Sequence, residues 1–338
     1  VHRTFLEYFC AWSFVWQFEK EQKISQDRLI EEIFGQHWPD EKWHEVLRLI
    51  VGMIDVKFVG EVICYLMKQD GEEKKFLNLF LAGKCLLEVR SRHSIGDMGY
   101  RLLNKLKDLT GYDLDYSYES YDSYSEEIYQ KNAALVCEIR TQAVEVVATT
   151  WRDDRLTYTW LKQRVEFDNS SSVRSEALRQ IATAWKHQPG IFDLLKQWVE
   201  SDDDTDVRRE ALRQIAIGWK QEPGIFDLLK QWVESDNSSS VRGEALRQIA
   251  TGWKHQPGIF DFLKQWIESD DDPHVRREAL RQIAIGWKHQ PGIFDFLKQW
   301  VESDDDPDVR REALRQIAAG WKQEPGIFDL LKQWVESD

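Results

Sequence analysis

The chain has 338 residues, which is more than one compact core usually holds, so we expect two regions or an elongated array. Hydrophobic residues make up 42% of the chain and aromatic residues 12%, which excludes wholesale disorder. The formal net charge of −14 argues against nonspecific binding to nucleic acids or anionic membranes.

The sequence also shows no membrane span, no signal peptide and no metal-binding cysteine motif. No uncharged apolar run approaches the ~18 residues that a membrane span needs, and there is no signal peptide. The four cysteines, Cys10, Cys64, Cys85 and Cys137, lie in apolar helical patterns without metal-binding spacing. We therefore predict a cytoplasmic protein with reduced thiols. Because Val1 already lies inside a helical pattern, we expect the chain to be a fragment of a longer protein.

Residues 1–112 are predicted to form an irregular helical region, because their apolar residues recur at helical spacing but show no longer repeat. The expected helices cover about residues 2–20, 25–35, 40–54, 56–69, 73–90 and 94–109.

Three short motifs in this region carry a resemblance to a known group. They are VHRTFLEYF at 1–9, FGQHW at 34–38 and WHEVLRL at 43–49. Over roughly residues 1–95 the chain resembles the helical region that follows the NACHT module in bacterial, particularly cyanobacterial, STAND NTPases, which are related to NOD-like receptors. The resemblance implies that an NTPase module precedes Val1 in the parent protein. It also implies that the region described here senses a partner, for instance in antiviral defence.

Residues 113–127 are rich in Tyr, Ser and acidic residues and show no helical period, so we expect a linker there. The remaining residues, 128–338, repeat with a period of 34 residues. A divergent copy covers 139–172, and five nearly identical copies cover 173–338. Residues such as Thr183, Ile217 and Thr251 alternate between successive copies, which suggests duplication of a 68-residue double unit.

Each copy is predicted to contain two helices. In the last copy, the first helix begins near Asp306 and Pro307, which suit the cap and the first turn, and it ends at the turn 324–326. The second helix follows and buries Ile327, Leu331 and Trp334 on one face. Such pairs bury their apolar faces by stacking, so the sequence predicts an all-α fold with an irregular N-terminal region followed by an α-solenoid.

The segment DPDVRREAL at 306–314 and its copies resemble HEAT repeats. Tetratricopeptide repeats share the 34-residue period, but their Trp-x-x-Leu-Gly-x-x-Tyr signature is absent from this sequence.

No catalytic motif was found. The sequence has no phosphate loop, no His-Glu-x-x-His, no Gly-x-Ser-x-Gly and no Cys/His ligand cluster, so we expect neither an enzyme nor a bound metal or cofactor. The Asp triplets that precede several first helices lack the spacing of a calcium loop, and we interpret them as helix caps.

Two recurring residue types could form functional ladders along the stack. An Arg after the conserved Val recurs at Arg174, Arg208, Arg242, Arg276 and Arg310. We interpret these arginines as partners of acidic residues in neighbouring loops rather than as a phosphate-binding stripe. The repeated tryptophans fall on apolar helical faces, so we expect them in the core rather than on a base-stacking platform.

The polar face of the second helices is the predicted partner-binding surface, which we expect on the concave side of the solenoid. The candidates are Asp193, Lys196, Gln197, Asp227, Lys230, Gln231, Asp261, Lys264, Gln265, Asp295, Lys298 and Gln299. An ordinary solvated face is the alternative interpretation of these residues. The predicted function is recognition of a protein or peptide partner that regulates the missing NTPase module in cis. A nucleic-acid-binding solenoid is the alternative.

Overall fold

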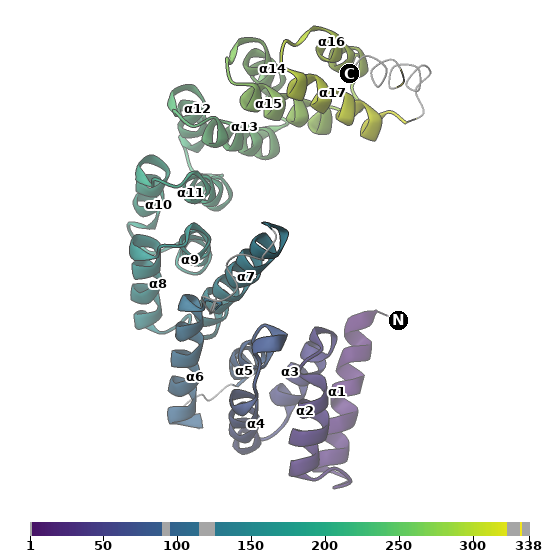
Figure 1. Cartoon of the computed structure of the whole chain (residues 1–338), viewed down its shortest axis with the longest axis vertical. Coiled ribbons are helices and arrows are strands. Elements are labelled where there is room, and N and C mark those ends of the chain that lie inside the picture. Colours follow the sequence, from purple (N-terminus) through teal and green to yellow (C-terminus); the bar gives the residue numbers. More distant parts are fainter. Residues whose placement is uncertain (1, 90–94, 115–125, 323–331, 333–338) are drawn as a thin grey trace. The chain divides into compact units, whose positions relative to one another are not determined.

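The computed structural model describes residues 2–89, 95–114, 126–322 and 332. These residues form helices, turns and loops, with no β-strand among them (Figure 1). Residues 1–184 and 185–338 form two compact units. The predicted all-α class, with an irregular helical region followed by a solenoid, is confirmed. The predicted domain limits remain predictions, and most of the predicted linker, residues 115–125, lies outside the described residues.

The first unit surrounds a single buried helix. Its helices are α1 (Arg3–Glu19), the π-helix η1 (Arg28–Phe34), α2 (Gly35–His37), η2 (Glu41–Trp43), α3 (His44–Met53), α4 (Val56–Lys68), η3 (Glu72–Lys74), α5 (Leu77–Leu87), α6 (Asp97–Asp108), η5 (Leu109–Gly111), α7 (Glu126–Thr150), α8 (Arg155–Phe167) and α9 (Ser171–Ala184). The sequence of α5, LNLFLAGKCLL, is apolar on nearly every side. Helices α3, α4, α6 and α7 all pack against it, so α5 is the centre of this core.

A glycine allows α5 and α7 to approach closely. A Cβ atom added at Gly83 would lie 2.4 Å from the Val146 Cγ1 atom, so any larger residue would force the helices apart. At the same contact the Thr150 hydroxyl donates a 3.2 Å hydrogen bond to the Gly83 carbonyl oxygen. This contact joins the irregular region to α7, the first helix of the divergent repeat.

Helix α1 has an exposed aromatic face. It fully buries only Ala11 and Val15. Phe14 and Phe18 pack partly buried against the core, whereas six other large apolar side chains of α1 are 43–60% exposed, namely Phe5, Leu6, Tyr8, Phe9, Trp12 and Trp16. Their spacing places most of them along one side of the helix, and the Trp12 and Trp16 rings stack with centroids 5.3 Å apart.

The second unit contains α10 (Ile191–Ser201), α11 (Thr205–Gly218), α12 (Ile225–Ser235), α13 (Ser239–Trp253), α14 (Ile259–Ser269), α15 (Pro273–Gly286), α16 (Ile293–Ser303) and α17 (Pro307–Gly320). The first helices of the copies are α11, α13, α15 and α17, and the second helices are α10, α12, α14 and α16. The carboxylates of Asp204, Asp272 and Asp306 accept hydrogen bonds from backbone N–H groups two residues ahead, as predicted for N-caps. Glycines such as Gly258, at φ 85°, begin the second helices in the left-handed conformation that the preceding turn requires.

The helices that pack most closely belong to successive copies. Each second helix packs mainly on the first helix that follows it across the loop between copies, as α12 does on α13 and α14 does on α15. Its contacts with the first helix that precedes it in the same copy are few. The two helices predicted for each copy are therefore present, and they pack mainly on helices of neighbouring copies.

The stacking of this unit also defines its inner side. Successive first helices pack directly on one another along α11, α13, α15 and α17, whereas successive second helices share few contacts (Figure 1). In a curved stack, the helices that lie closest together are on the concave side. The second helices therefore lie on the outer side, and the expectation that they line the concave side is wrong for these repeats.

Candidate inner binding surface

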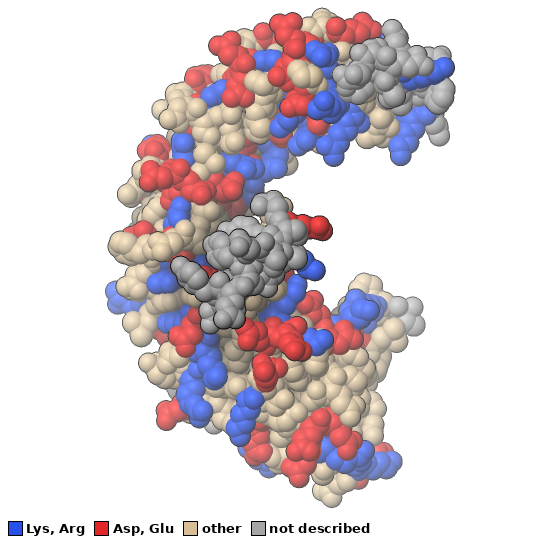
Figure 2. Space-filling model, in the orientation of Figure 1, with Lys and Arg blue, Asp and Glu red and all other residues tan. Residues whose placement is uncertain are grey.

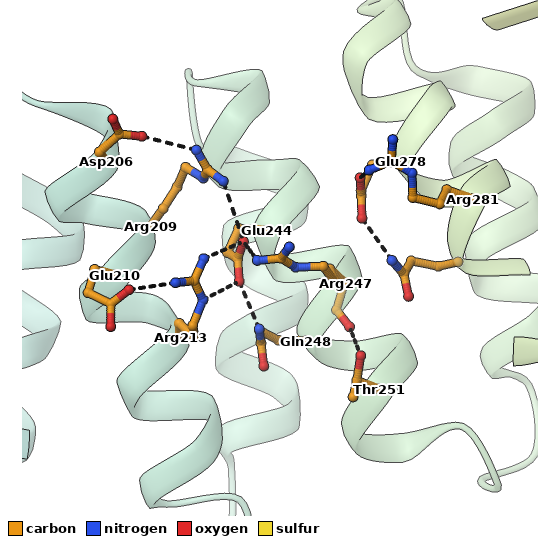
Figure 3. Close-up of polar contacts among 11 residues, drawn as sticks. Asp206, Arg209, Glu210, Arg213, Glu244, Arg247, Gln248, Thr251, Glu278 and Arg281 are labelled. Atoms are coloured by element: carbon orange, nitrogen blue, oxygen red, sulfur yellow. Dashed lines mark hydrogen bonds and ion pairs between the residues drawn. The ribbon is translucent and has the colours of Figure 1, made fainter. Parts of the chain in front are cut away.

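A buried carboxylate occurs at the interface between α11 and α13. The side chain of Glu244 is 1% exposed. It accepts hydrogen bonds from Arg213 Nε at 3.2 Å, from Gln248 Nε2 at 2.7 Å and from Arg247 Nη2 (Figure 3). Arg213 also contacts Glu210 of its own helix at 2.6 Å. The cluster thus links two repeats through one shared anion.

The environment of Glu244 favours its charged form. Burial alone would raise the pKa of the carboxyl, but the hydrogen bonds from Arg247, Arg213 and Gln248 outweigh it and lower the pKa. Similarly, burial would lower the pKa of Arg213, while the hydrogen bond and charge of Glu244 raise it. Glu244 and Arg213 therefore form a stable ion pair.

The same link recurs two repeats further on. Arg281 of α15 donates from Nε to Glu312 of α17 at 2.9 Å, 31 residues along the chain, as Arg213 does to Glu244. Between these two interfaces, α13 meets α15 differently. Gly243 stands where neighbouring copies have arginine, and a Cβ atom there would lie 3.2 Å from the His274 ring. The two kinds of interface therefore alternate, in step with the 68-residue double unit.

A strip of cations and small or apolar side chains lies on the first helices and in the turns that follow them. We call it the inner strip, and it consists of Arg213, Ile217, Lys220, Arg247, Thr251, Lys254, Arg277, Arg281, Ile285, Lys288, Arg315, Ala319 and Lys322. Figure 2 shows lysine and arginine gathered on this side of α11–α17, and aspartate and glutamate gathered on the opposite rim. The carboxylates within the strip, such as Glu244 and Glu312, are buried behind arginines.

Three lysines of the strip, Lys220, Lys254 and Lys288, reach toward the next repeat. The Lys220 side chain passes Gly252, with its Cε atom 3.6 Å from the position a Cβ would take, and its ammonium lies 5.8 Å from the centroid of the Trp253 ring. The side chain of Lys254 passes Gly286 in the same way. These lysines thus pack their stems on protein while their charged ends remain at the surface.

Exposed isoleucines alternate with threonine along the strip. Ile217 is 63% exposed and Ile285 is 62% exposed, and both occupy the position that Thr251 holds in the copy between them. The alternation of threonine and isoleucine was visible in the sequence, but the exposure of the isoleucine side chains was not. Neither isoleucine was among the predicted site residues.

The predicted site residues lie on the outer, second helices. Their aspartates and glutamines are exposed, and Lys196, Lys230 and Lys264 are half-buried. Lys264 lies 3.6 Å from Glu268 one turn away, and Lys298 lies 3.9 Å from Glu302. The structure brings the candidates together on one side of the second helices, and their role in binding remains a prediction.

The arginine ladder ties neighbouring loops together, as interpreted from the sequence. Arg242 contacts Asp270 at 3.0 Å and Arg276 contacts Asp304 at 3.0 Å, each 28 residues further along the chain. Arg276 also donates to the carbonyl oxygen of Asp270, in the loop before its own helix, at 2.9 Å. The side chains of Arg242 and Arg276 are only 16% and 15% exposed, so they are not available to grip phosphates.

The prediction that the repeat tryptophans lie in the core holds for part of them: Trp185, Trp232, Trp253 and Trp287 are buried, whereas Trp198, Trp219, Trp266, Trp300 and Trp321 are partly buried and Trp334 lies outside the described residues. Trp232 is 4% exposed, Trp253 is 9% exposed and Trp287 is 7% exposed. Trp253 packs against Phe226 of α12 with ring centroids 5.7 Å apart. Within the described ranges, no three potential metal ligands lie together. No helix in the described part of the chain has the length and apolar composition to cross a membrane.

The stacked helix pairs define the class of the protein, an α-solenoid. Its repeats match the family described as HEAT repeats over residues 158–250, 226–318 and 260–338, which together cover more than half of the chain. The chain therefore belongs to the HEAT-repeat family. No curated protein and no solved structure matches it. HEAT repeats commonly mediate protein–protein interactions, and their solenoids are typically not enzymes.

Proposed function

We propose that the repeats form an interaction scaffold that binds a protein or peptide partner along the inner strip. The observation that carries this proposal is the recurrence of lysine and arginine at equivalent positions in successive copies, together with the exposed isoleucines of α11 and α15. Lys220, Arg315 and Lys322 of this strip are exposed, and its other cations are partly exposed. The outer Lys264 and Lys298 lie 3.6 Å and 3.9 Å, respectively, from a glutamate one turn away, whereas the strip's Lys254 and Lys288 have no ion pair among the described residues.

Repetition makes such a surface effective. A single exposed charge contributes at most about 1 kcal/mol, because water and salt screen it. The same contact repeated over several helices can add up when the ligand runs along the stack. A ligand of this kind must be elongated, which a protein segment can be.

Site-specific photocrosslinking in the source cells tests this proposal. A photoreactive amino acid at Thr251 reports on the inner strip, and the same amino acid at Gln265 reports on the outer surface; both positions are exposed. We expect a discrete protein adduct from Thr251 and none from Gln265. An adduct from Gln265 alone would instead support the outer candidate residues, and no adduct from either position would contradict the scaffold proposal.

We further propose that the parent protein couples this binding to a NACHT-type NTPase in defence signalling against phage. The support is the resemblance within residues 1–95, together with the exposed aromatic face of α1, against which an NTPase module in cis would pack. We expect Phe9→Ser combined with Trp12→Ser to change the basal ATPase rate of the intact parent, because the substitutions weaken that packing. An unchanged rate would contradict this coupling. The matched control is Tyr100→Ser, an exposed aromatic outside α1.

A further inference from the structure

We infer that the ligand of the inner strip is an acidic, extended protein segment with apolar side chains spaced two repeats apart. This inference rests on the proposed function and adds the chemistry of the partner. It follows from the charge, the apolar positions and the spacing of the strip.

The charge of the strip is opposite to that of the chain. The chain carries a net charge of −14, yet cations dominate this side of the second unit (Figure 2). Among the described residues, Arg277, Lys254 and Lys288 have no ion pair, and Arg315, 73% exposed, has one contact at 3.9 Å, to Glu312. Carboxylates of a ligand would supply the missing partners, whereas a basic segment would be repelled.

The apolar positions favour protein over nucleic acid. Ile217 and Ile285 present aliphatic surface, which a phosphate backbone would leave unmatched but a leucine or valine would cover. Binding of single-stranded nucleic acid usually relies on exposed aromatic rings for base stacking. The strip itself contains no aromatic residue, and of the tryptophans beside it Trp253 and Trp287 are buried while Trp219 and Trp321 are partly buried.

The spacing of the isoleucines sets the spacing in the ligand. Packed helices lie about 8–10 Å apart, so Ile217 and Ile285, two repeats apart, are separated by roughly 16–20 Å. An extended chain covers about 3.3 Å per residue, so this distance corresponds to about six residues. Alternate residues of an extended chain share one side, so two apolar residues six positions apart both face the strip, and acidic residues between them face the cations.

A synthetic peptide tests this geometry on the full chain. The probe is a fluorescein-labelled nonapeptide, Asp-Leu-Ser-Glu-Ser-Glu-Ser-Leu-Asp, and the readout is fluorescence anisotropy. We expect saturable binding, weakened roughly tenfold by Ile217→Ser with Ile285→Ser, because apolar contact is lost. Serine in place of both leucines should weaken binding similarly. Absence of binding to the unmodified protein would overturn the inference.

Two lysine triplets provide a matched control for charge. Lys220→Glu, Lys254→Glu and Lys288→Glu reverse three charges on the inner strip, and we expect binding to weaken about tenfold or more. Lys230→Glu, Lys264→Glu and Lys298→Glu reverse three charges on the outer surface, and we expect less than about a twofold change. Circular dichroism spectra and melting curves establish that both variants fold. Equal weakening by the two triplets would show only the effect of net charge and would overturn the assignment to the strip.

Two further outcomes separate this inference from the proposed function. If a thymidine oligonucleotide of equal charge bound more tightly than the peptide and lost affinity steeply with salt, the ligand would be a nucleic acid and the inference would be wrong. If the protein crosslinked at Thr251 contacted the strip through a neutral or basic segment, the scaffold proposal would stand while the acidic ligand would be excluded. Crosslinking to an acidic, leucine- or valine-containing segment would support both.

Discussion

The interface of α7 with α9 and that of α11 with α13 use equivalent positions, but the first places two glutamates there and the second an arginine and a glutamate. In the repeat unit, Arg213 pairs with Glu244. In the first unit, Glu145 stands at the position equivalent to Arg213, and Glu176 stands at the position equivalent to Glu244. The pKa of Glu176 is raised, chiefly by burial and additionally by the charge of Glu145, despite its hydrogen bonds with Gln180 and Arg179. The comparison teaches that the apolar positions are enough to keep the helices stacked, while the polar partners change how the interface responds to pH.

The apolar contribution should give the largest effect in both regions. We expect Trp253→Ala to lower the free energy of unfolding by about 3–5 kcal/mol, because a large buried ring is removed. The equivalent Trp151 is only partly buried, so Trp151→Ala should cost less. Urea denaturation followed by circular dichroism measures both. A cost for Trp253→Ala below about 1 kcal/mol would mean that its ring does not stabilise the core.

Removal of the shared anion should have the next largest effect. We expect Glu244→Gln to destabilise the protein by about 1–3 kcal/mol at neutral pH, because Arg213 and Arg247 lose their counterion. Since the pKa of folded Glu244 is lowered from 4.5, its contribution is present above pH 4.5 and is lost as the pH falls through the folded pKa. The difference in unfolding free energy between wild type and variant, measured from pH 7 down to 3, should therefore shrink. A constant difference would contradict the ion-pair interpretation.

A reversed charge at Glu145 should have a smaller effect, of the opposite sign. Glu145→Arg introduces the arginine found in the other copies and should stabilise the protein by up to about 1 kcal/mol at neutral pH, since the site is exposed. The raised pKa of Glu176 means that its contribution is present below pH 4.5 and is lost as the pH rises through the folded pKa. The gain from Glu145→Arg should thus appear above that range. Thermal melts at pH 4 and pH 7 check this, and destabilisation at pH 7 would contradict it.

Two glycines on α13 should show the smallest difference. Replacing glycine with alanine inside a helix usually stabilises by roughly 0.5–1 kcal/mol. A Cβ at Gly252 would lie 3.6 Å from the flexible end of Lys220, so Gly252→Ala should show this gain. A Cβ at Gly243 would lie 3.2 Å from the His274 ring, so Gly243→Ala should gain less or nothing. Equal gains in chemical denaturation would show that His274 moves aside freely.

Much of the fold could be predicted from the sequence, because the relevant signals are local. The helix period, the Asp caps and the pairing of Arg242 and Arg276 with loop acids all follow from spacing and charge within a few tens of residues. Which helices lie on the inner side of the stack could not be predicted. A strict repeat looks the same whichever helix is counted first, so the period does not say on which side of a helix its main partner lies.

The direction in which the stack of repeats curves could not be predicted from the sequence either. It depends on how closely first helices approach one another compared with second helices, which small differences in side-chain volume determine. For this reason the outer residues such as Lys264 were expected on the concave side, whereas the inner strip with Ile217 and Ile285 was missed as a surface. In the irregular region the positions of α3 to α6 were close to those expected, but the close contact of Gly83 with α7 required three-dimensional information.

The arginine ladder has a consequence for how such an array can change its length. Arg242 forms an ion pair with Asp270 in the loop that follows the next second helix. Arg276, one repeat further on, forms the equivalent ion pair with Asp304. Unequal crossing-over that inserts or deletes a whole number of repeats leaves every internal arginine with an equivalent acceptor. An insertion or deletion that is not a whole number of repeats would leave a largely buried arginine side chain without its carboxylate partner. The array can thus lengthen or shorten by whole repeats without losing these ion pairs. Recombination between the near-identical copies could in this way produce arrays that bind partners of different length.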